Sequence, residues 1–153
     1  MFSKACEYAM RAIVYVATCT MEKRRVAVKE IVEVTGIPEA FASKVMQRLV
    51  RAGMVESLRG KKGGFSMSET QLAQSLYEVV ALFEGEHYFN SCLLGLPKCS
   101  SYKPCPLHHQ VVGLRDALKK RLQETSIRQA AEEVSNAGAH LRLEIPARND
   151  EHH

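Results

Sequence analysis

The sequence lacks a hydrophobic run long enough to cross a membrane. Its longest unbroken apolar stretch, residues 12–17, is six residues long, whereas a membrane-spanning helix needs roughly 20. No secretory leader is expected, because Glu7 and Arg11 interrupt the apolar stretch near the N-terminus. The cysteines number five, an odd count without a secretion signal, which argues against a disulfide scaffold and for a reducing, cytoplasmic setting.

Recognisable catalytic patterns are also missing, and the chain is predicted not to be an enzyme. No Ser/His/Asp order and no paired carboxylates stand out. The glycines of residues 60–64 lack the strand-to-helix setting that a nucleotide-binding loop needs. What is there is an ordinary globular composition, with 46% apolar and 25% charged residues among 153, which excludes wholesale disorder.

Charge is distributed unevenly along the chain. Residues 1–68 carry 12 Lys/Arg against 6 Glu, a formal charge of +6, whereas residues 69–153 carry 9 Lys/Arg against 11 Asp/Glu, a charge of −2. A basic N-terminal half attached to a near-neutral remainder indicates a module that binds a polyanion. A charged surface that is merely solvated is the simpler alternative.

Apolar spacing predicts that the first half of the chain is mainly helical. Proline and glycine mark the ends of the third helix, since Pro38 suits its first position and Gly53 suits a left-handed stop. The expected helices cover residues 3–20, 28–34, 38–52 and 75–85. The third is expected to turn one apolar stripe inward, formed by Phe41, Val45, Leu49 and Ala52.

A β-hairpin is expected between the third and fourth of these helices. Strands at residues 54–58 and 65–67 flank a glycine-rich turn, and glycine reaches positive φ at low cost. Two helices joined by a short turn and followed by such a hairpin make a winged helix-turn-helix domain, which we assign to residues 1–85. The predicted fold class is mainly α with a small β-hairpin wing.

Duplex DNA is the polyanion that this arrangement suits. A helix fits the major groove and reads base edges with its exposed polar side chains, and residues 43–64 hold six Lys/Arg against one Glu. An arginine at the hairpin is expected to enter a narrow A·T-rich minor groove. The candidate DNA-binding residues are Ser43, Lys44 and Gln47 for base edges, Arg48 for phosphates, and Arg59, Lys61 and Lys62 on the wing.

Residues 86–106 show no helical or strand period and contain three cysteines. In a loop the thiolates of Cys92, Cys99 and Cys105 can converge, and His108 follows close behind. Thiolates and imidazole suit an iron–sulfur cluster or zinc. Structural zinc usually shows closer cysteine pairs, so iron–sulfur is favoured, with zinc or no metal as the alternatives.

The C-terminal part is expected to mediate dimerisation. Apolar residues recur at helical spacing over residues 107–122, and a lone helix could not leave such a stripe in water. A short helix is expected to follow, so that residues 107–137 form one unit, and residues 138–153 form a tail that is disordered or part of a tag. The stripe comprises Leu107, Val111, Leu114, Leu118 and Leu122.

Several motifs together resemble the IscR/NsrR-type winged-helix repressors, the Rrf-two family. The resemblance covers roughly residues 2–135 and is most specific at the wing, where Arg59-Gly60 is followed by Gly63-Gly64-Phe65. It implies a homodimer paired through the long C-terminal helix and bound to a pseudo-palindromic operator. Further matching stretches are residues 37–38, 44–49, 52–55, 57–58, 75–80 and 84–85.

The resemblance also implies that the three cysteines of the loop bind an iron–sulfur cluster whose presence or state controls DNA affinity. Cys105-x2-His108 looks like the ending of the branch with a [2Fe-2S] cluster, although this chain has one extra residue between Cys92 and Cys99; a [4Fe-4S] cluster is the alternative. The branch that senses nitric oxide takes an acidic ligand from the partner's first helix. The fourth ligand therefore stays open: His108 leads, Glu7 follows, and His109 and His87 are further alternatives.

Two other functions remain under consideration. One is a metal-free regulator of the same fold that responds to a ligand or a partner protein. The other is a zinc-binding scaffold protein whose basic face is incidental. Visible colour separates a cluster protein from a metal-free one, and salt-dependent DNA binding separates a regulator from a scaffold.

Overall fold

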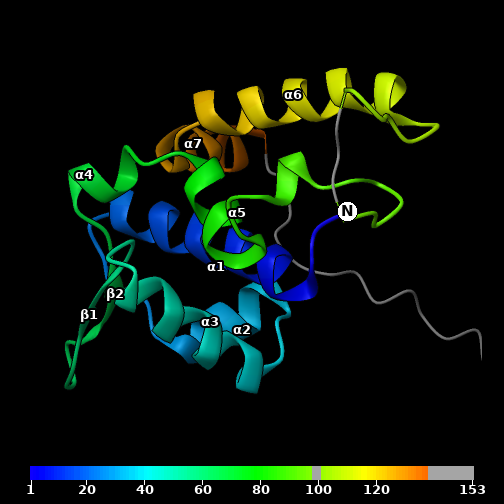
Figure 1. Ribbon diagram of the computed structural model, residues 1–153. Coiled ribbons are helices and arrows are strands. Elements are labelled where there is room, and N and C mark those ends of the chain that lie inside the picture. The colour runs from blue at the N-terminus through cyan, green and yellow to red at the C-terminus, as the bar shows by residue number, and fades with distance from the viewer. Residues whose placement is uncertain (98–100, 138–153) are drawn as a thin grey trace, which may run out of the picture.

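The computed structural model describes residues 1–97 and 101–137. It confirms a mainly helical fold with one two-stranded antiparallel hairpin in the described part. In Figure 1, α1 crosses the middle, α2, α3 and the hairpin lie on one side of it, and α6 and α7 lie on the other. No helix in these residues is both long and apolar enough to span a bilayer. The elements are α1 Lys4–Met21, α2 Val28–Thr35, α3 Glu39–Arg51, β1 Glu56–Leu58, β2 Gly64–Ser66, α4 Glu69–Leu72, α5 Leu76–Glu84, the 3-10 helix η1 Tyr88–Asn90, α6 His108–Glu124 and α7 Ile127–Ala137.

Helix α1 is the centre of the winged domain because apolar side chains surround most of its length. The hydroxyl of Ser3 accepts a hydrogen bond from the amide N–H of Cys6 at 3.2 Å and thereby caps the first turn of α1. α2, α3, α5 and α7 all pack against it. Its fully buried residues include Ala9, Ala12, Ile13, Val16, Ala17 and Cys19.

The turn between α2 and α3 is fixed by a glycine, a buried isoleucine and a proline. Gly36 takes φ = 70°, which favours glycine, and ends α2. Ile37 is fully buried, and Pro38 is the residue just before α3 rather than its first member. The Arg11 guanidinium donates to the carbonyl of Thr35 at 3.2 Å, so the turn is also tied to α1.

The predicted inward stripe of α3 is wrong at two positions. Phe41 is 51% exposed and Ala52 is exposed, whereas Val45 and Leu49 are buried as expected. Ala42 and Met46 complete the stripe, because the 3.6-residue period places them on the same face as Val45 and Leu49. Phe41 lies at the edge of this face, with its ring edge-on to that of Tyr8 at 5.7 Å, and Ala52 lies beyond the last helical residue.

The hairpin is held to the domain by a third short stretch of extended chain. Ser57 pairs with Phe65 across the two strands. Val26 bridges to Phe65 on the other side: its N–H donates to the Phe65 carbonyl at 3.0 Å, and its carbonyl accepts from the Phe65 N–H at 2.7 Å. Gly64 makes this approach possible, since a Cβ there would lie 2.8 Å from the Val26 carbonyl oxygen.

Helix α7 completes the core of the winged domain instead of extending α6. Ile127 and Ala131 are fully buried in the same cluster as the α1 and α3 residues. Two backbone bonds fix its start: Leu76 N–H donates to Thr125 O at 3.0 Å, and Ile127 N–H donates to Gln74 O at 2.8 Å. The sequence-based grouping joined this helix to α6, but in space it lies against α1 and α4.

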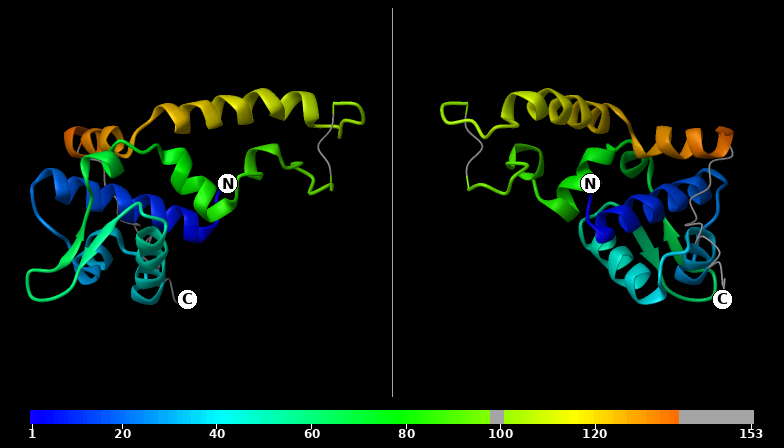
Figure 2. Two further views of the ribbon diagram at one scale, coloured as in Figure 1. Left: turned by 60° about the vertical axis from the view of Figure 1, so that its left-hand side comes forward. Right: turned by 90° about the vertical axis from the view of Figure 1, so that its right-hand side faces the viewer.

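Helix α6 contributes to an apolar cluster of its own chain in its second half. Leu122 is buried in a small second cluster with Cys6, Val80 and Phe89, and Leu118 packs against that cluster. Leu114, one turn earlier, is 72% exposed. Both views in Figure 2 show the first half of α6 and the connected loop projecting beyond the winged domain. The apolar stripe is therefore split between an internal contact and an open face.

Candidate DNA-binding surface and cysteine loop

The outer face of α3 presents the residues expected to read bases. Lys44 and Gln47 are exposed and Ser43 is half-buried, while Val45 and Leu49 anchor the opposite face in the core. This anchoring fixes the helix axis, so the polar side chains project from a rigid support. The arrangement is that of a recognition helix.

The wing presents its cations at the tip of a tight turn. Gly63 N–H donates to Gly60 O at 3.0 Å, so Lys61 and Lys62 occupy the turn itself. Both lysines and Arg59 are exposed. Figure 2 shows the hairpin tip and α3 extending from the domain on the same side, away from α6. Two basic elements thus share one face, as contact with a duplex requires.

Arg48 is placed differently from the other predicted DNA-binding residues. Its Nη2 donates to the carbonyl oxygen of Leu82 at 2.7 Å, and its guanidinium carbon lies 4.5 Å from the ring centroid of Phe83. Leu82 and Phe83 belong to the last turn of α5. The guanidinium therefore links α3 to α5.

Two of the three loop cysteines lie together. The Cys92 thiol is buried and lies within hydrogen-bonding reach of Cys105. Its pKa is lowered, first by the backbone amides of Leu96 and Leu94, then by Cys105 and by the positive charge of Arg115. The backbone N–H groups of Leu96 and Leu94 thus donate to the Cys92 sulfur, and such hydrogen bonds stabilise a thiolate.

Arg115 is a site residue that the sequence analysis missed. Its guanidinium donates to the carbonyl of Ser91 and its charge favours the thiolate of the adjacent Cys92. A signal was available, because Arg115 follows His108 by seven residues. That spacing is two helical turns and puts both on one face of α6.

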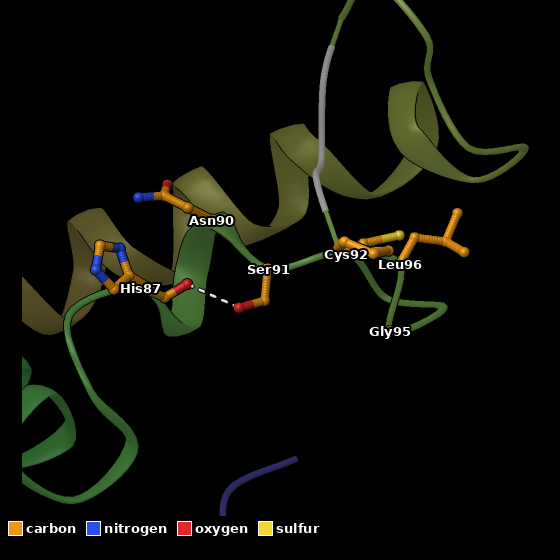
Figure 3. A pocket seen from close by; sticks show the side chains of 7 residues that line it. His87, Asn90, Ser91, Cys92, Gly95 and Leu96 are labelled. Atoms are coloured by element: carbon orange, nitrogen blue, oxygen red, sulfur yellow. Dashed lines mark hydrogen bonds between the residues drawn. The ribbon is translucent and has the colours of Figure 1, made fainter.

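The other predicted ligands are not gathered around this thiol pair. Cys99 lies outside the described residues. His87 lines a cavity of about 410 Å³ together with Cys92 (Figure 3), whereas His108 lines a separate cavity of about 250 Å³ with Arg115. Within residues 1–97 and 101–137, no three His, Cys, Asp or Glu side chains lie close enough to hold a metal ion. Among the described residues, two thiols therefore lie together without a third candidate ligand beside them.

Two further ligand candidates contact other side chains. His109 is exposed at the start of α6, with its ring edge-on to that of His108 at 5.2 Å. The Glu7 carboxylate forms an ion pair with Lys4 at 3.2 Å on the first turn of α1. Neither side chain joins the Cys92–Cys105 pair within one protomer.

The two cysteines of α1 are structural. Cys6 and Cys19 are fully buried. Burial, with the charges of Glu84 and Glu7, raises the pKa of Cys6 to about 12, and burial raises that of Cys19 as well. Neither thiol is poised to ionise, so both fill space in the core.

Comparison with known proteins agrees with this geometry. Residues 2–133 match the model of the Rrf2 family, described as iron-dependent transcriptional regulators. The chain belongs to this family. It is 33% identical over 129 residues to a putative HTH-type transcriptional regulator of Aquifex aeolicus, covering 83% of this chain and 88% of that protein. It is 30% identical over 105 residues to the HTH-type transcriptional repressor NsrR of Streptomyces coelicolor, covering 69% and 66%. Its relatives are regulators of transcription and not enzymes.

Solved structures of this family share the fold of this Rrf2 protein. CymR, the global cysteine regulator of B. subtilis, superposes with a TM-score of 0.70 at 21% identity, over 86% of this chain and 96% of that one. The IscR of T. potens superposes with a TM-score of 0.68 at 16% identity, over 91% of each chain. These likenesses confirm the winged-helix architecture.

Proposed function

We propose that this Rrf2 regulator is a homodimeric repressor whose operator affinity is controlled by an iron–sulfur cluster in the loop of residues 86–106. The observation that carries the proposal is the Cys92–Cys105 pair, in which the backbone amides of Leu96 and Leu94 favour the thiolate of Cys92. Cys99, six residues before Cys105, would supply the third thiolate. Iron–sulfur clusters are held by cysteine thiolates, and hydrogen bonds to the sulfurs tune their reduction potential.

The proposed cluster needs a fourth ligand besides the three thiolates, and the candidates are imidazole and carboxylate side chains. We favour His108, which follows Cys105 and donates its backbone N–H to the Cys105 carbonyl at 3.0 Å. Glu7 of the partner subunit's first helix, His87 and His109 are the alternatives. Bound there, a [2Fe-2S] or [4Fe-4S] cluster supplies an iron centre that responds to redox state, nitric oxide or iron–sulfur supply. The protein's own part is to hold the sulfurs and to exclude other ligands.

Metal analysis tests the cluster directly. Protein purified without oxygen should be coloured and contain stoichiometric iron and sulfide, and Cys92→Ala or Cys105→Ala should abolish the visible absorbance. Cys19→Ala is the matched control, because this thiol is buried in the core and should leave the spectrum intact. Colourless wild-type protein after cluster reconstitution would contradict the proposal.

The proposed DNA contacts follow from the shared face of α3 and the wing. Ser43, Lys44 and Gln47 read base edges in successive major grooves, about one helical turn apart in a palindromic operator, while Arg59, Lys61 and Lys62 contact the flanking backbone and minor groove. Gln47→Ala should relax base preference by about 1–3 kcal/mol at one operator position. Equal discrimination by wild type and variant across operator mutants would remove Gln47 from the reading set.

The proposed dimer uses the open face of α6. Leu114 is 72% exposed, and the half-buried Leu107 and Val111 extend the same stripe towards the loop. A second copy is the expected partner, because a palindromic operator requires a two-fold symmetric protein. The cysteine loop then lies beside the dimer seam, where a change in the loop can alter the spacing of the two recognition helices.

A metal-free thiol regulator is the second candidate. The favouring observation is the same Cys92–Cys105 contact, because a peroxide or disulfide oxidant can take two electrons and two protons from two adjacent thiols and join them in a disulfide. CymR, the global cysteine regulator, shares the fold. Colour and iron content separate the candidates, since a dithiol switch needs neither. The zinc-scaffold alternative would instead give colourless, zinc-containing protein.

A further inference from the structure

Helix α5, like α1 through Cys6, contributes to both apolar clusters of the molecule. Val79 belongs to the main core with α1 and α3, and the next residue, Val80, belongs to the second cluster with Phe89 of η1 and Leu122 of α6. α5 therefore contacts the DNA-binding domain on one side and the base of the cysteine loop on the other.

Arg48 connects the recognition helix to the end of this helix. The last carbonyls of a helix have no partner within it, and the Arg48 guanidinium supplies one to Leu82 at 2.7 Å. Its position over the Phe83 ring adds a cation–π contact, and its charge complements the C-terminal end of the α5 dipole. Arg48 directly follows Gln47, so this tether acts beside the base-reading residues.

The same end of α5 is tied to the cysteine loop. Gly85 ends the helix at φ = 89°. Its carbonyl accepts a hydrogen bond at 3.2 Å from the N–H of Tyr88, the first residue of η1. The Ser91 hydroxyl then donates to the carbonyl of His87 at 2.9 Å (Figure 3). Cys92 follows immediately. A continuous set of short-range contacts thus leads from the thiol pair to the carbonyl that Arg48 holds.

We propose that Arg48 is a positioning residue that couples the cysteine loop to the recognition helix, through its bond to Leu82 and its contact with Phe83. The proposal rests on the proposed function, since it assigns a route to the control of DNA affinity by the cluster. A change in loop order shifts the end of α5, and the guanidinium transfers that shift to α3. A phosphate contact alone would give Arg48 no such role.

The test compares operator affinity of cluster-loaded and cluster-free protein for three variants. Arg48→Met keeps an unbranched apolar stem and removes the guanidinium. Arg51→Met removes the same charge from an exposed position on the same helix. Arg48→Lys keeps a positive charge without the guanidinium. For the wild type, a ratio between the two forms of roughly 5–150-fold is typical of coupled sites. Visible absorbance and thermal unfolding confirm that each variant is folded and holds its cluster.

Arg48→Met should bring the ratio towards one, and Arg48→Lys should keep part of it. Arg51→Met removes a positive charge that attracts the phosphate backbone, so it should weaken both forms equally and leave the ratio intact. Coupling is reciprocal, so operator binding should change amide exchange in residues 86–97 of the wild type and not of Arg48→Met. A full wild-type ratio in Arg48→Met would overturn the positioning role alone. A wild-type ratio of one would overturn the proposed function, and this inference with it.

Discussion

Replacing Gly64 by alanine tests how the wing is attached to the domain. Gly64 and Gly60 both adopt positive φ, +126° and +105°, so alanine is strained at either position by about 1–3 kcal/mol. At Gly60 a Cβ would meet nothing within 4 Å. At Gly64 it would lie 2.8 Å from the Val26 carbonyl oxygen and 3.0 Å from its carbonyl carbon. Gly60→Ala is therefore a matched control, because it has the backbone strain of a positive φ without the steric clash against Val26.

The difference between the two variants measures the close approach. Backbone atoms of Val26 cannot yield like a flexible side chain, so the Val26–Phe65 bridge must open. Its two hydrogen bonds, 3.0 and 2.7 Å long, contribute about 0.5–1.5 kcal/mol each. We expect Gly64→Ala to lower the free energy of unfolding by about 1–3 kcal/mol more than Gly60→Ala does.

Urea unfolding is the appropriate assay, since a shift in midpoint at constant slope reports stability directly. Operator binding should show the same order, because a detached hairpin would no longer hold Arg59 in the position proposed for its contact with the duplex. Equal midpoints for the two alanine variants would refute the role of Gly64 in the close packing of the wing.

Three further predictions concern the helix stripe, the wing and acid stability. Leu114→Glu should dissociate the proposed dimer in sedimentation experiments without loss of monomer stability, whereas Leu118→Glu should destabilise the fold itself. Gln123→Glu, at an exposed position on the opposite face of α6, should do neither. A Leu114→Glu protein that is still dimeric would place the interface elsewhere. Arg59→Ala should weaken binding most at operators with A·T-rich flanks, whereas Lys61→Ala should mainly reduce the slope of log affinity against log salt, by about one. If Arg59→Ala weakens binding equally on all flanks, insertion of Arg59 into the minor groove is excluded. The Tyr15 hydroxyl, 2.7 Å from Glu30, lowers the pKa of the Glu30 carboxyl. The stabilisation from this bond is therefore present above the usual pKa of 4.5 and is lost as the pH falls through the folded-state pKa. Glu30→Gln should flatten this acid-side loss of stability, and an unchanged dependence of stability on pH would count against the role of the bond.

The winged domain could be predicted because its signals are local. Gly36 and Gly53 end helices at positive φ, and the glycines around Lys61 and Lys62 define the turn. These features depend on a few neighbouring residues, whose preferred backbone angles are known. The same holds for the polar face of α3, which follows from helical periodicity alone.

Long-range packing could not be predicted in the same way. Helical spacing grouped Leu118 and Leu114 in one stripe, but whether a stripe residue meets its own chain or a partner depends on where α5 lies. Arg48 was expected to face phosphates because an arginine on a recognition helix usually does so. Its tether to Leu82 depends on residues 34 positions away, which no local pattern reveals. α7 was likewise joined to α6 because the two are adjacent in sequence.

Operator affinity before and after removal of the cluster tests the central claim most directly. A single anaerobic preparation is titrated by fluorescence anisotropy against a labelled operator, first loaded and then after chelation of its iron, with visible absorbance recorded throughout. We predict that affinity changes by roughly 5–150-fold as the absorbance disappears, and that Cys92→Ala, which cannot hold the cluster, binds with the affinity of the iron-free form. One unchanging affinity across loaded, stripped and Cys92→Ala protein would contradict the account.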